Sequence, residues 1–214
     1  MQVTERNTKG RILDAAERLF ARDGFHATSL RNITREASVN LAAVNYHFGS
    51  KEALISEVIS RRMVPINRMR MGRLRAVMAE SVNQQARPDV SEILSVFFRP
   101  TLVFLETSSQ AKEFVTIIGR AMPEPDDTVR NILIGHLEPV FRYLLEILCF
   151  ALPHVPYRVL YWRLQFALGA FSHVMRTARD PIFMPDDLKP EEDIGSIIDV
   201  LIPFLTAGME EAVE

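Results

Sequence analysis

The stretch at residues 40–51, NLAAVNYHFGSK, places an asparagine amide among small and apolar residues, ahead of a phenol, an imidazole and an ammonium group. Val44 and Phe48 are four residues apart, so on a helix they share one face and can point into a core. The residues that then point outwards together near the start of this helix are Leu41, Ala42 and Asn45.

An outward face of this kind suits contact with the base edges of duplex DNA. The amide of Asn45 both donates and accepts hydrogen bonds, as an adenine edge does, and Leu41 can contact a thymine methyl group. The small side chains of Ala42 and Ala43 allow close approach. Donors near the end of the helix can reach phosphates; they are Tyr46, His47 and Lys51. For each of these residues, the alternative is that it lies on an ordinary helix surface and contacts no DNA.

Catalytic chemistry finds little support in the sequence. It contains no glycine-rich phosphate loop and no nucleophile elbow. Cys149 lies in the apolar run 147–150, which favours packing over a nucleophilic role. No two histidines are spaced as metal ligands on one helix; they are His26, His47, His136, His154 and His173. We therefore predict no enzyme, no metal and no other cofactor.

Three short helices are predicted to position the stretch 40–51. The first covers about 8–23, where the apolar residues follow helical spacing, and Gly24 ends it. The second begins after Thr28 or Ser29, either of which can cap it. A break at Ser38 precedes the third helix, which Asn40 caps. Two helices joined by so tight a turn favour a helix-turn-helix, the alternative being a corner of a plain helical bundle.

The rest of the chain predicts an all-α protein, because no useful period-2 alternation occurs. Breaks are expected at Pro65 and at four other proline-containing segments, 87–88, 123–125, 153–156 and 181–190. The expected helices cover 51–64, 66–84, 89–106, 108–121, 127–151, 156–179 and 191–211. We expect an N-terminal helix-turn-helix domain, residues 1–52, and a larger helical domain, residues 53–214.

Charge is divided unevenly along the chain. Residues 1–75 carry 14 Lys and Arg against 7 Asp and Glu, a net +7, and the remaining residues carry 11 against 20, a net −9. A basic end on an acidic body is compatible with nucleic-acid binding. The alternative is a solvated helix face, because much of the excess comes from Arg61, Arg62, Arg68, Arg70, Arg73 and Arg75.

The expected location is a reducing cytoplasm. The start of the chain is polar, its single cysteine rules out an intrachain disulfide framework, and no apolar run is long enough to cross a membrane.

The segments GFHATSLRNI at 24–33, ASVN at 37–40 and YHFGSKEAL at 46–54 resemble the TetR family of bacterial transcriptional regulators. The resemblance covers about residues 8–58. The segment 39–48 is similar to the fatty-acid-responsive branch of that family. Two residues depart from the family pattern. Ser38 stands where the turn usually has Gly, and Asn45 stands where many members have Tyr.

The resemblance implies a DNA-binding role for particular residues. Base-facing positions fall on Leu41, Ala42 and Asn45, and Arg31 is placed to contact a groove edge or a phosphate. The full DNA-binding set is Thr28, Ser29, Arg31, Asn40, Leu41, Ala42, Ala43, Asn45, Tyr46, His47 and Lys51.

The resemblance also implies that the protein is a homodimer and that its partner is double-stranded DNA, in which it binds a palindromic operator. Its interface is expected in the last two helices, where 194–205 is rich in apolar residues and Gly169 permits close packing; burial within one subunit is the alternative.

The resemblance further implies that residues 53–214 form the effector-binding and dimerisation domain, and that a small hydrophobic ligand, with an acyl chain as the preferred candidate, releases the protein from DNA. The residues predicted to bind it are Phe97, Phe98, Arg99, Arg120, Met122, His136 and Phe141, although a plain core is the alternative for the aromatic ones. Two functional alternatives stay open: a multidrug-efflux regulator with an aromatic or cationic ligand, and a helical interaction protein that does not bind DNA.

Overall fold

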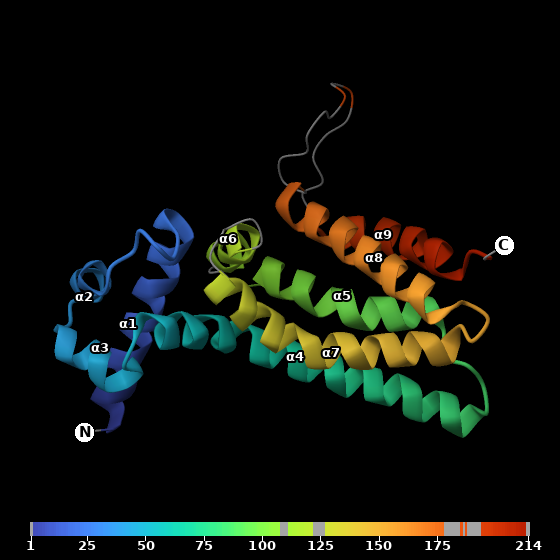
Figure 1. Ribbon diagram of the computed structural model, residues 1–214, viewed down its shortest axis with the longest axis horizontal. Helices are drawn as coiled ribbons and strands as arrows, with labels where there is room; N and C mark the ends of the chain where they lie inside the picture. The colour runs from blue at the N-terminus through green and yellow to red at the C-terminus, as the bar shows by residue number, and fades with distance from the viewer. Residues whose placement is uncertain are drawn as a thin grey trace. The chain divides into compact units, whose positions relative to one another are not determined.

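The computed structural model describes residues 2–107, 111–121, 127–177, 185, 187 and 194–212, and helices account for most of them (Figure 1). No residue within these ranges lies in a β-strand, which confirms the all-α prediction. The helices are α1 (Gln2–Asp23), α2 (Leu30–Ala37), α3 (Leu41–Phe48), α4 (Lys51–Gln84), α5 (Val90–Thr107), α6 (Ala111–Ala121), α7 (Asp127–Ala151), α8 (Tyr157–Thr177) and α9 (Ile194–Glu210).

The chain folds as two units with separate cores. The first comprises residues 1–65 and 109–136, and the second comprises residues 66–108 and 137–214. The long helices α4 and α7 each contribute to both units. None of the helices described is long and apolar enough to cross a lipid bilayer.

In the first unit, α1 packs against α2, α3 and α6, and α2 packs against α3. One stripe of α1 is buried, as its helical spacing predicts. Phe20 of this stripe lies with its ring centroid 5.7 Å from that of Phe25 in the segment after the helix. Ile33 of α2 and Val44 of α3 are fully buried as well. These contacts fix the two short helices that form the helix-turn-helix.

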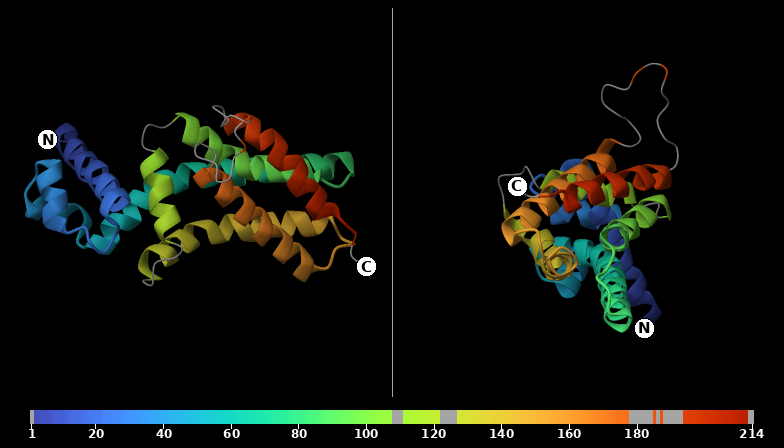
Figure 2. Two further views of the ribbon diagram at one scale, coloured as in Figure 1. Left: turned by 90° about the horizontal axis from the view of Figure 1, so that it is seen from above. Right: turned by 90° about the vertical axis from the view of Figure 1, so that its right-hand side faces the viewer.

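In the second unit, α9 packs against both α5 and α8, which run beside it in both orientations of Figure 2. Aromatic rings fill much of this core. Phe98 of α5 lies 5.0 Å from Phe97 and 4.6 Å from Phe171 of α8, measured between ring centroids. Large apolar side chains of this unit that have no exposed surface include Leu74, Ile93, Leu94, Leu144 and Leu164.

One predicted break is wrong. The sequence predicts two helices separated at Pro65, whereas α4 runs without interruption from Lys51 to Gln84 with Pro65 inside it. Proline removes one backbone hydrogen bond, but buried apolar residues on both sides, Met63 and Ile66, hold the flanking turns in place. The predicted breaks at 87–88 and 153–156 are confirmed, while those at 123–125 and 181–190 fall wholly or mostly outside the residues that the structure describes.

Candidate nucleic-acid interface

The turn between α2 and α3 is built from backbone geometry that favours glycine. Ser38 adopts φ 52° and ψ 50°, the left-handed conformation, and its N–H donates to the carbonyls of Thr34 and Arg35 at the end of α2. An L-residue is strained there. Ser38 therefore occupies a position whose geometry suits the glycine usual in this turn.

Two side chains cap the short helices as predicted. The Ser29 hydroxyl accepts from the N–H of Asn32, 3.1 Å away, at the start of α2. The Asn40 side-chain oxygen accepts from the N–H of Ala43, 2.8 Å away, at the start of α3. Both caps satisfy N–H groups that the first turn of a helix leaves unpaired. The amide of Asn40 is therefore occupied in setting where α3 begins.

Helix α3 has one buried face and one exposed face. Val44 and Phe48 are buried, which confirms the predicted orientation. The opposite side of the helix exposes Leu41, Ala42 and Asn45. Leu41, which is 41% exposed, adds an apolar side chain to this face.

A second group of exposed polar residues lies at the end of α3. Tyr46 is 77% exposed, and its ring centroid lies 5.1 Å from that of the half-buried His47. On α2, Arg31 is exposed, and no described side chain pairs with it. These side chains keep their donors available to a partner at the surface.

Lys51 is held against the core by two contacts. Its Nζ lies 4.4 Å from the centroid of the Phe25 ring and donates to the carbonyl of His26 at 3.3 Å. Partial burial lowers the pKa of the ammonium group from its usual value. An ammonium carries three donors, so Lys51 can keep this bond and still offer hydrogens to a phosphate.

Thr28 does not fit the phosphate-contact role predicted for it. Its side chain is fully buried, and its hydroxyl donates to the carbonyl of Gly24 at 2.8 Å, with the carbonyl of Leu19 at 3.2 Å. The hydroxyl is thus committed to closing the end of α1. Thr28 supports the interface from within and does not lie on it.

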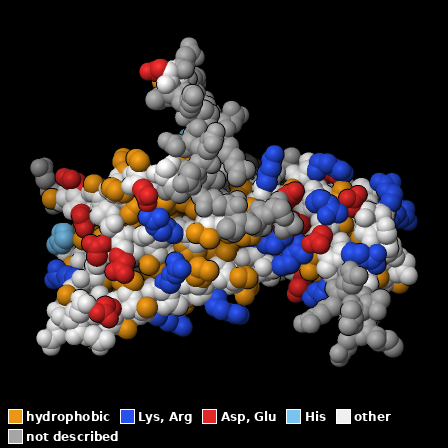
Figure 3. All heavy atoms as spheres, turned by 180° about the vertical axis from the view of Figure 1, so that it is seen from behind, with side chains coloured by type: hydrophobic (Ala, Val, Ile, Leu, Met, Phe, Trp, Pro, Cys, Tyr) orange, Lys and Arg blue, Asp and Glu red, His pale blue; other side chains and the backbone are white. Residues whose placement is uncertain are grey.

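Basic side chains are numerous on the helices that carry this surface. On the face shown in Figure 3, Lys and Arg side chains gather over the part of the molecule formed by the first three helices. Among the described side chains of α1 and α2, the exposed arginines are Arg11, Arg18, Arg22, Arg31 and Arg35. A positive field at this end favours approach of a polyanion.

The residues predicted to bind a ligand are divided between the two units. Phe97 and Phe98 are buried in the core of the second unit. Arg99 is exposed and donates to Asp199 at 2.5 Å and to Ser95 at 2.8 Å. His136 belongs to the first unit, where its Nε2 lies 3.0 Å from the Ser60 hydroxyl.

The other three predicted ligand residues give less information. The ring of Phe141 is half-buried, with its centroid 6.3 Å from that of Tyr161. Met122 and the side chain of Arg120 lie outside what the structure describes.

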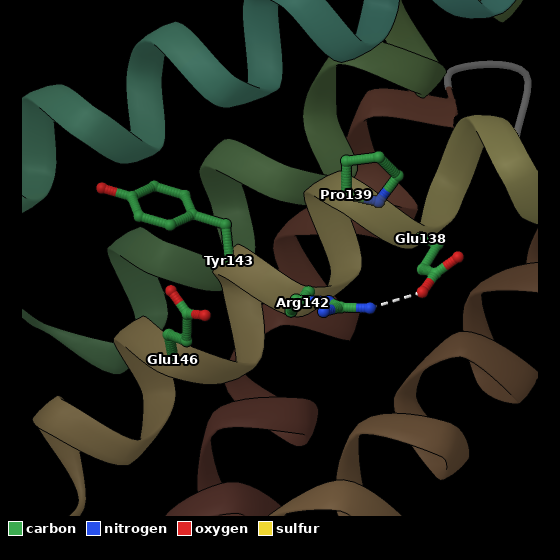
Figure 4. Close-up of a pocket in the computed structure, with 5 residues that line it drawn as sticks. All are labelled: Glu138, Pro139, Arg142, Tyr143 and Glu146. Atoms are coloured by element: carbon green, nitrogen blue, oxygen red, sulfur yellow. Dashed lines mark hydrogen bonds and ion pairs between the residues drawn. The ribbon is translucent and has the colours of Figure 1, made fainter.

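A surface pocket of about 460 Å³ lies along α7. The residues that line it include none of those predicted to bind a ligand. Arg142 reaches Glu138 at 2.5 Å, while Tyr143 and Glu146 project away from this pair (Figure 4). Three of its five lining residues, Glu138, Arg142 and Glu146, are charged, whereas a site for a hydrophobic ligand is expected to be lined by apolar and aromatic side chains.

Two family models match this chain. The model described as "Bacterial regulatory proteins, tetR family" matches residues 12–58, the helix-turn-helix, and the model described as "Tetracyclin repressor-like, C-terminal domain" matches residues 95–208, more than half of the chain. This chain belongs to the TetR family of transcriptional regulators.

Relatives by sequence agree with the assignment over the helix-turn-helix. The regulator UidR of Escherichia coli strain K12 is 39% identical over 59 residues, which are 28% of this chain and 30% of UidR. The regulator AcrR of Shigella flexneri is 43% identical over 51 residues, 24% of each chain. The matched segment thus spans less than a third of the length of either relative.

Solved structures share the whole fold. FadR of Bacillus halodurans, titled a fatty acid degradation regulator, superposes with a TM-score of 0.64 at 16% identity, covering 93% of this chain and 98% of FadR. NalD of Pseudomonas aeruginosa, titled a repressor of a multidrug efflux pump, has a TM-score of 0.62 at 21% identity, covering 93% and 96%. At such identities the TetR fold is common to all three chains.

Two buried charged groups of this TetR-family chain escape prediction from the sequence. Glu17 on α1 is 1% exposed and accepts hydrogen bonds from Arg61 and Arg62. Arg70 on α4 is 4% exposed. Arg70 belongs to a run of arginines, and such a run predicts a solvated helix face. The sequence signal for its burial is that some of these arginines share helical spacing with apolar neighbours.

Proposed function

We propose that this TetR-family regulator is a ligand-responsive repressor that binds a palindromic operator as a homodimer. The observation that carries the proposal is the exposed start of α3, where Leu41, Ala42 and Asn45 face outwards from a helix-turn-helix. In this class of motif the start of the second helix contacts base edges in the major groove.

The proposed contacts divide into two kinds. Asn45 hydrogen-bonds to a base, and Leu41 packs on a thymine methyl group. Ser29, Tyr46, His47 and Lys51 contact phosphates, which position the helix without selecting the sequence. Arg31 has the reach and the charge for either task.

Exposed apolar stripes on the last two helices support the homodimer. On α8 the stripe contains Trp162 and Phe166, four residues apart, and continues to the exposed Gly169, beside whose Cα a methyl group would meet no atom within 4 Å. On α9 it contains Val200 and Phe204, also four residues apart. A second copy of the chain would bury these rings.

The α9 residues of the proposed interface differ from those that the sequence singles out. Ile198, Leu201, Ile202 and Leu205 are buried within the protomer itself. The apolar excess of this helix therefore fills its own subunit's core, and the residues left for a partner are the exposed ones between them.

The ligand proposed is a small hydrophobic molecule with an acyl chain. The Phe-rich core around α5 and α8 supplies apolar surroundings, and the segment 39–48 resembles the fatty-acid-responsive branch. The same fold occurs in a fatty acid degradation regulator and in an efflux-pump repressor. Because the fold does not distinguish between these two kinds of regulator, an aromatic or cationic ligand is the second candidate. Binding would favour a conformer whose two α3 helices no longer match major grooves about 34 Å apart.

Two measurements test this function. Selection of bound duplexes from a random pool, followed by gel shifts at low and high salt, should yield a palindrome bound more tightly than scrambled DNA. A protein with no preference for any duplex would be a helical interaction protein instead. Fatty acids and acyl thioesters of graded length should then release the selected duplex. Release by an aromatic cation alone would favour the efflux alternative.

A further inference from the structure

Arg70 of α4 is a buried guanidinium in the second unit, with 4% of its surface exposed. Its Nε donates to the carbonyl of Phe97 at 2.8 Å, and its Nη2 donates to the Thr101 hydroxyl at 2.5 Å. Its Nη1 donates to the side-chain oxygen of Asn67 at 3.2 Å. All three acceptors are uncharged.

No described carboxylate forms an ion pair with Arg70, unlike several other arginines of this chain. Arg61, Arg62 and Arg99 each contact an acidic side chain. Burial lowers the pKa of Arg70 to about 10, so the group still carries its charge at neutral pH. A buried charge is costly unless an opposite charge accompanies it. The interior of this unit therefore holds one positive charge that no described side chain neutralises.

The geometry leaves Arg70 able to accept an anion. A guanidinium has five N–H donors, and three are used, so one hydrogen remains on each terminal nitrogen. A carboxylate can accept from both terminal nitrogens at once. The ring of Phe97 lies under the guanidinium, with its centroid 4.4 Å from Cζ, and fixes the plane of the fork.

The surroundings of this fork are apolar. Phe97 also contacts Phe98 edge to face, and Phe98 packs against Phe171 of α8. An anion that reaches Arg70 thus brings its attached group in among aromatic rings. This combination fits a carboxylate on a hydrocarbon chain better than a compact hydrated ion such as phosphate.

We propose that Arg70 anchors the carboxylate of the ligand, and that the ligand is an aliphatic monocarboxylate whose chain lies among the rings of Phe97, Phe98 and Phe171. This inference rests on the proposed acyl-chain ligand and specifies which chemical group is recognised. It places the anchor at Arg70, which is not among the residues that the sequence predicts to bind the ligand.

The test compares pairs of ligands that differ only in the head group. Laurate and dodecanol, and palmitate and hexadecanol, are titrated into the full-length protein by calorimetry, and DNA release is followed in parallel. The acid should bind at least about tenfold more tightly than the alcohol, because a hydrogen-bonded charge pair replaces a neutral contact. Palmitoyl-CoA, which lacks a free carboxylate, should show no advantage over hexadecanol.

Three variants locate the anchor. Arg70→Met keeps the length of the side chain and should remove the preference for the acid while leaving alcohol binding within about twofold. Arg70→Lys keeps the charge without the fork and should retain part of the preference. Arg75→Met changes an exposed arginine of the same helix and should behave as wild type. Thermal melts of each free protein report folding.

The outcomes separate the two proposals. Equal binding of acid and alcohol by wild type would overturn the anchor and leave the acyl-chain ligand standing, and this comparison needs no variant to fold. A preference that survives in Arg70→Met, or is lost in Arg99→Met instead, would also overturn it. A protein that binds none of these chains and releases DNA with none of them would overturn both.

Discussion

Glu17 of α1 and Arg62 of α4 are joined by two parallel hydrogen bonds, from Nε at 2.9 Å and from Nη2 at 2.8 Å, one to each carboxylate oxygen. Arg61 also donates to Glu17 and to Asp14, the latter at 2.6 Å. The contact with Glu17 raises the pKa of Arg62, foremost through the hydrogen bonds. This cluster ties the first helix of the DNA-binding part to the helix that follows α3.

Glu17→Gln should destabilise the protein by about 3 kcal/mol, because it leaves two partly buried guanidinium groups without their buried counter-charge. Urea denaturation followed by circular dichroism measures the change. Glu36→Gln is the matched control, since Glu36 forms a surface pair with Arg18 at 3.2 Å and should cost no more than about 0.5 kcal/mol. Equal effects of the two substitutions would contradict a structural role for the cluster.

Ser38→Gly should stabilise the protein by about 1 kcal/mol, because glycine adopts the left-handed conformation of this position without steric cost. Ser38→Ala serves as the control. It removes the same hydroxyl but keeps the Cβ, and it should give no such gain. A stabilisation shared by both variants would show that the hydroxyl, and not the backbone, is unfavourable.

The helix-turn-helix could be predicted from the sequence because its determinants are local. The cap at Asn40, the left-handed turn at Ser38 and the buried spacing of Val44 and Phe48 each depend on residues a few positions apart. Such features follow from propensity and periodicity alone. The same reasoning predicts which side of α3 is exposed.

Features that depend on tertiary packing could not be predicted in this way. Thr28 and Arg70 have polar side chains whose burial is decided by helices distant in sequence. Pro65 is tolerated because packing on both sides outweighs the lost hydrogen bond. On α9, apolar residues occur on two faces, so periodicity cannot say which face fills the core and which is left for a partner.

Phe204→Arg and Phe166→Arg should each give monomers. Both rings are exposed in the protomer, at 69% and 68%, so each substitution removes little packing within the subunit. A symmetric interface loses each contact twice, and two losses of about 2 kcal/mol weaken the dimer roughly a thousandfold. Sedimentation velocity at micromolar concentration measures the change.

Phe150→Arg is the control for this experiment, because Phe150 is an exposed ring on α7 outside the proposed interface. Dimers that persist in both the α8 and the α9 variants would place the interface elsewhere. A wild-type protein that sediments as a monomer would remove the dimer altogether.

Lys51→Met should weaken binding to cognate and scrambled duplexes alike. The ammonium contributes a phosphate contact and no base contact. The slope of the logarithm of the binding constant against the logarithm of the salt concentration should therefore become shallower by about 0.9 per subunit, or nearly 2 for a dimer. Methionine keeps much of the packing on Phe25 that the lysine stem supplies. Gel shifts over a salt series measure the slope. A loss confined to the cognate duplex would show that Lys51 acts in sequence recognition instead.

Asn45→Ala should cost roughly 2–6 kcal/mol on the cognate palindrome and almost nothing on scrambled DNA. A bidentate amide contact with adenine contributes about 1–3 kcal/mol, and a symmetric dimer makes it twice. Asn45 is exposed on α3 next to the buried Val44, so its loss should leave dimerisation and thermal stability unchanged.

Asn40→Ala is the contrasting variant, because it removes the cap of α3 and should lower stability by about 1 kcal/mol. Titrations of both duplexes at one salt concentration give the two losses for each protein. Equal losses on both duplexes for Asn45→Ala would mean that the amide contacts the backbone, and Arg31 would then be the remaining polar side chain able to select a base.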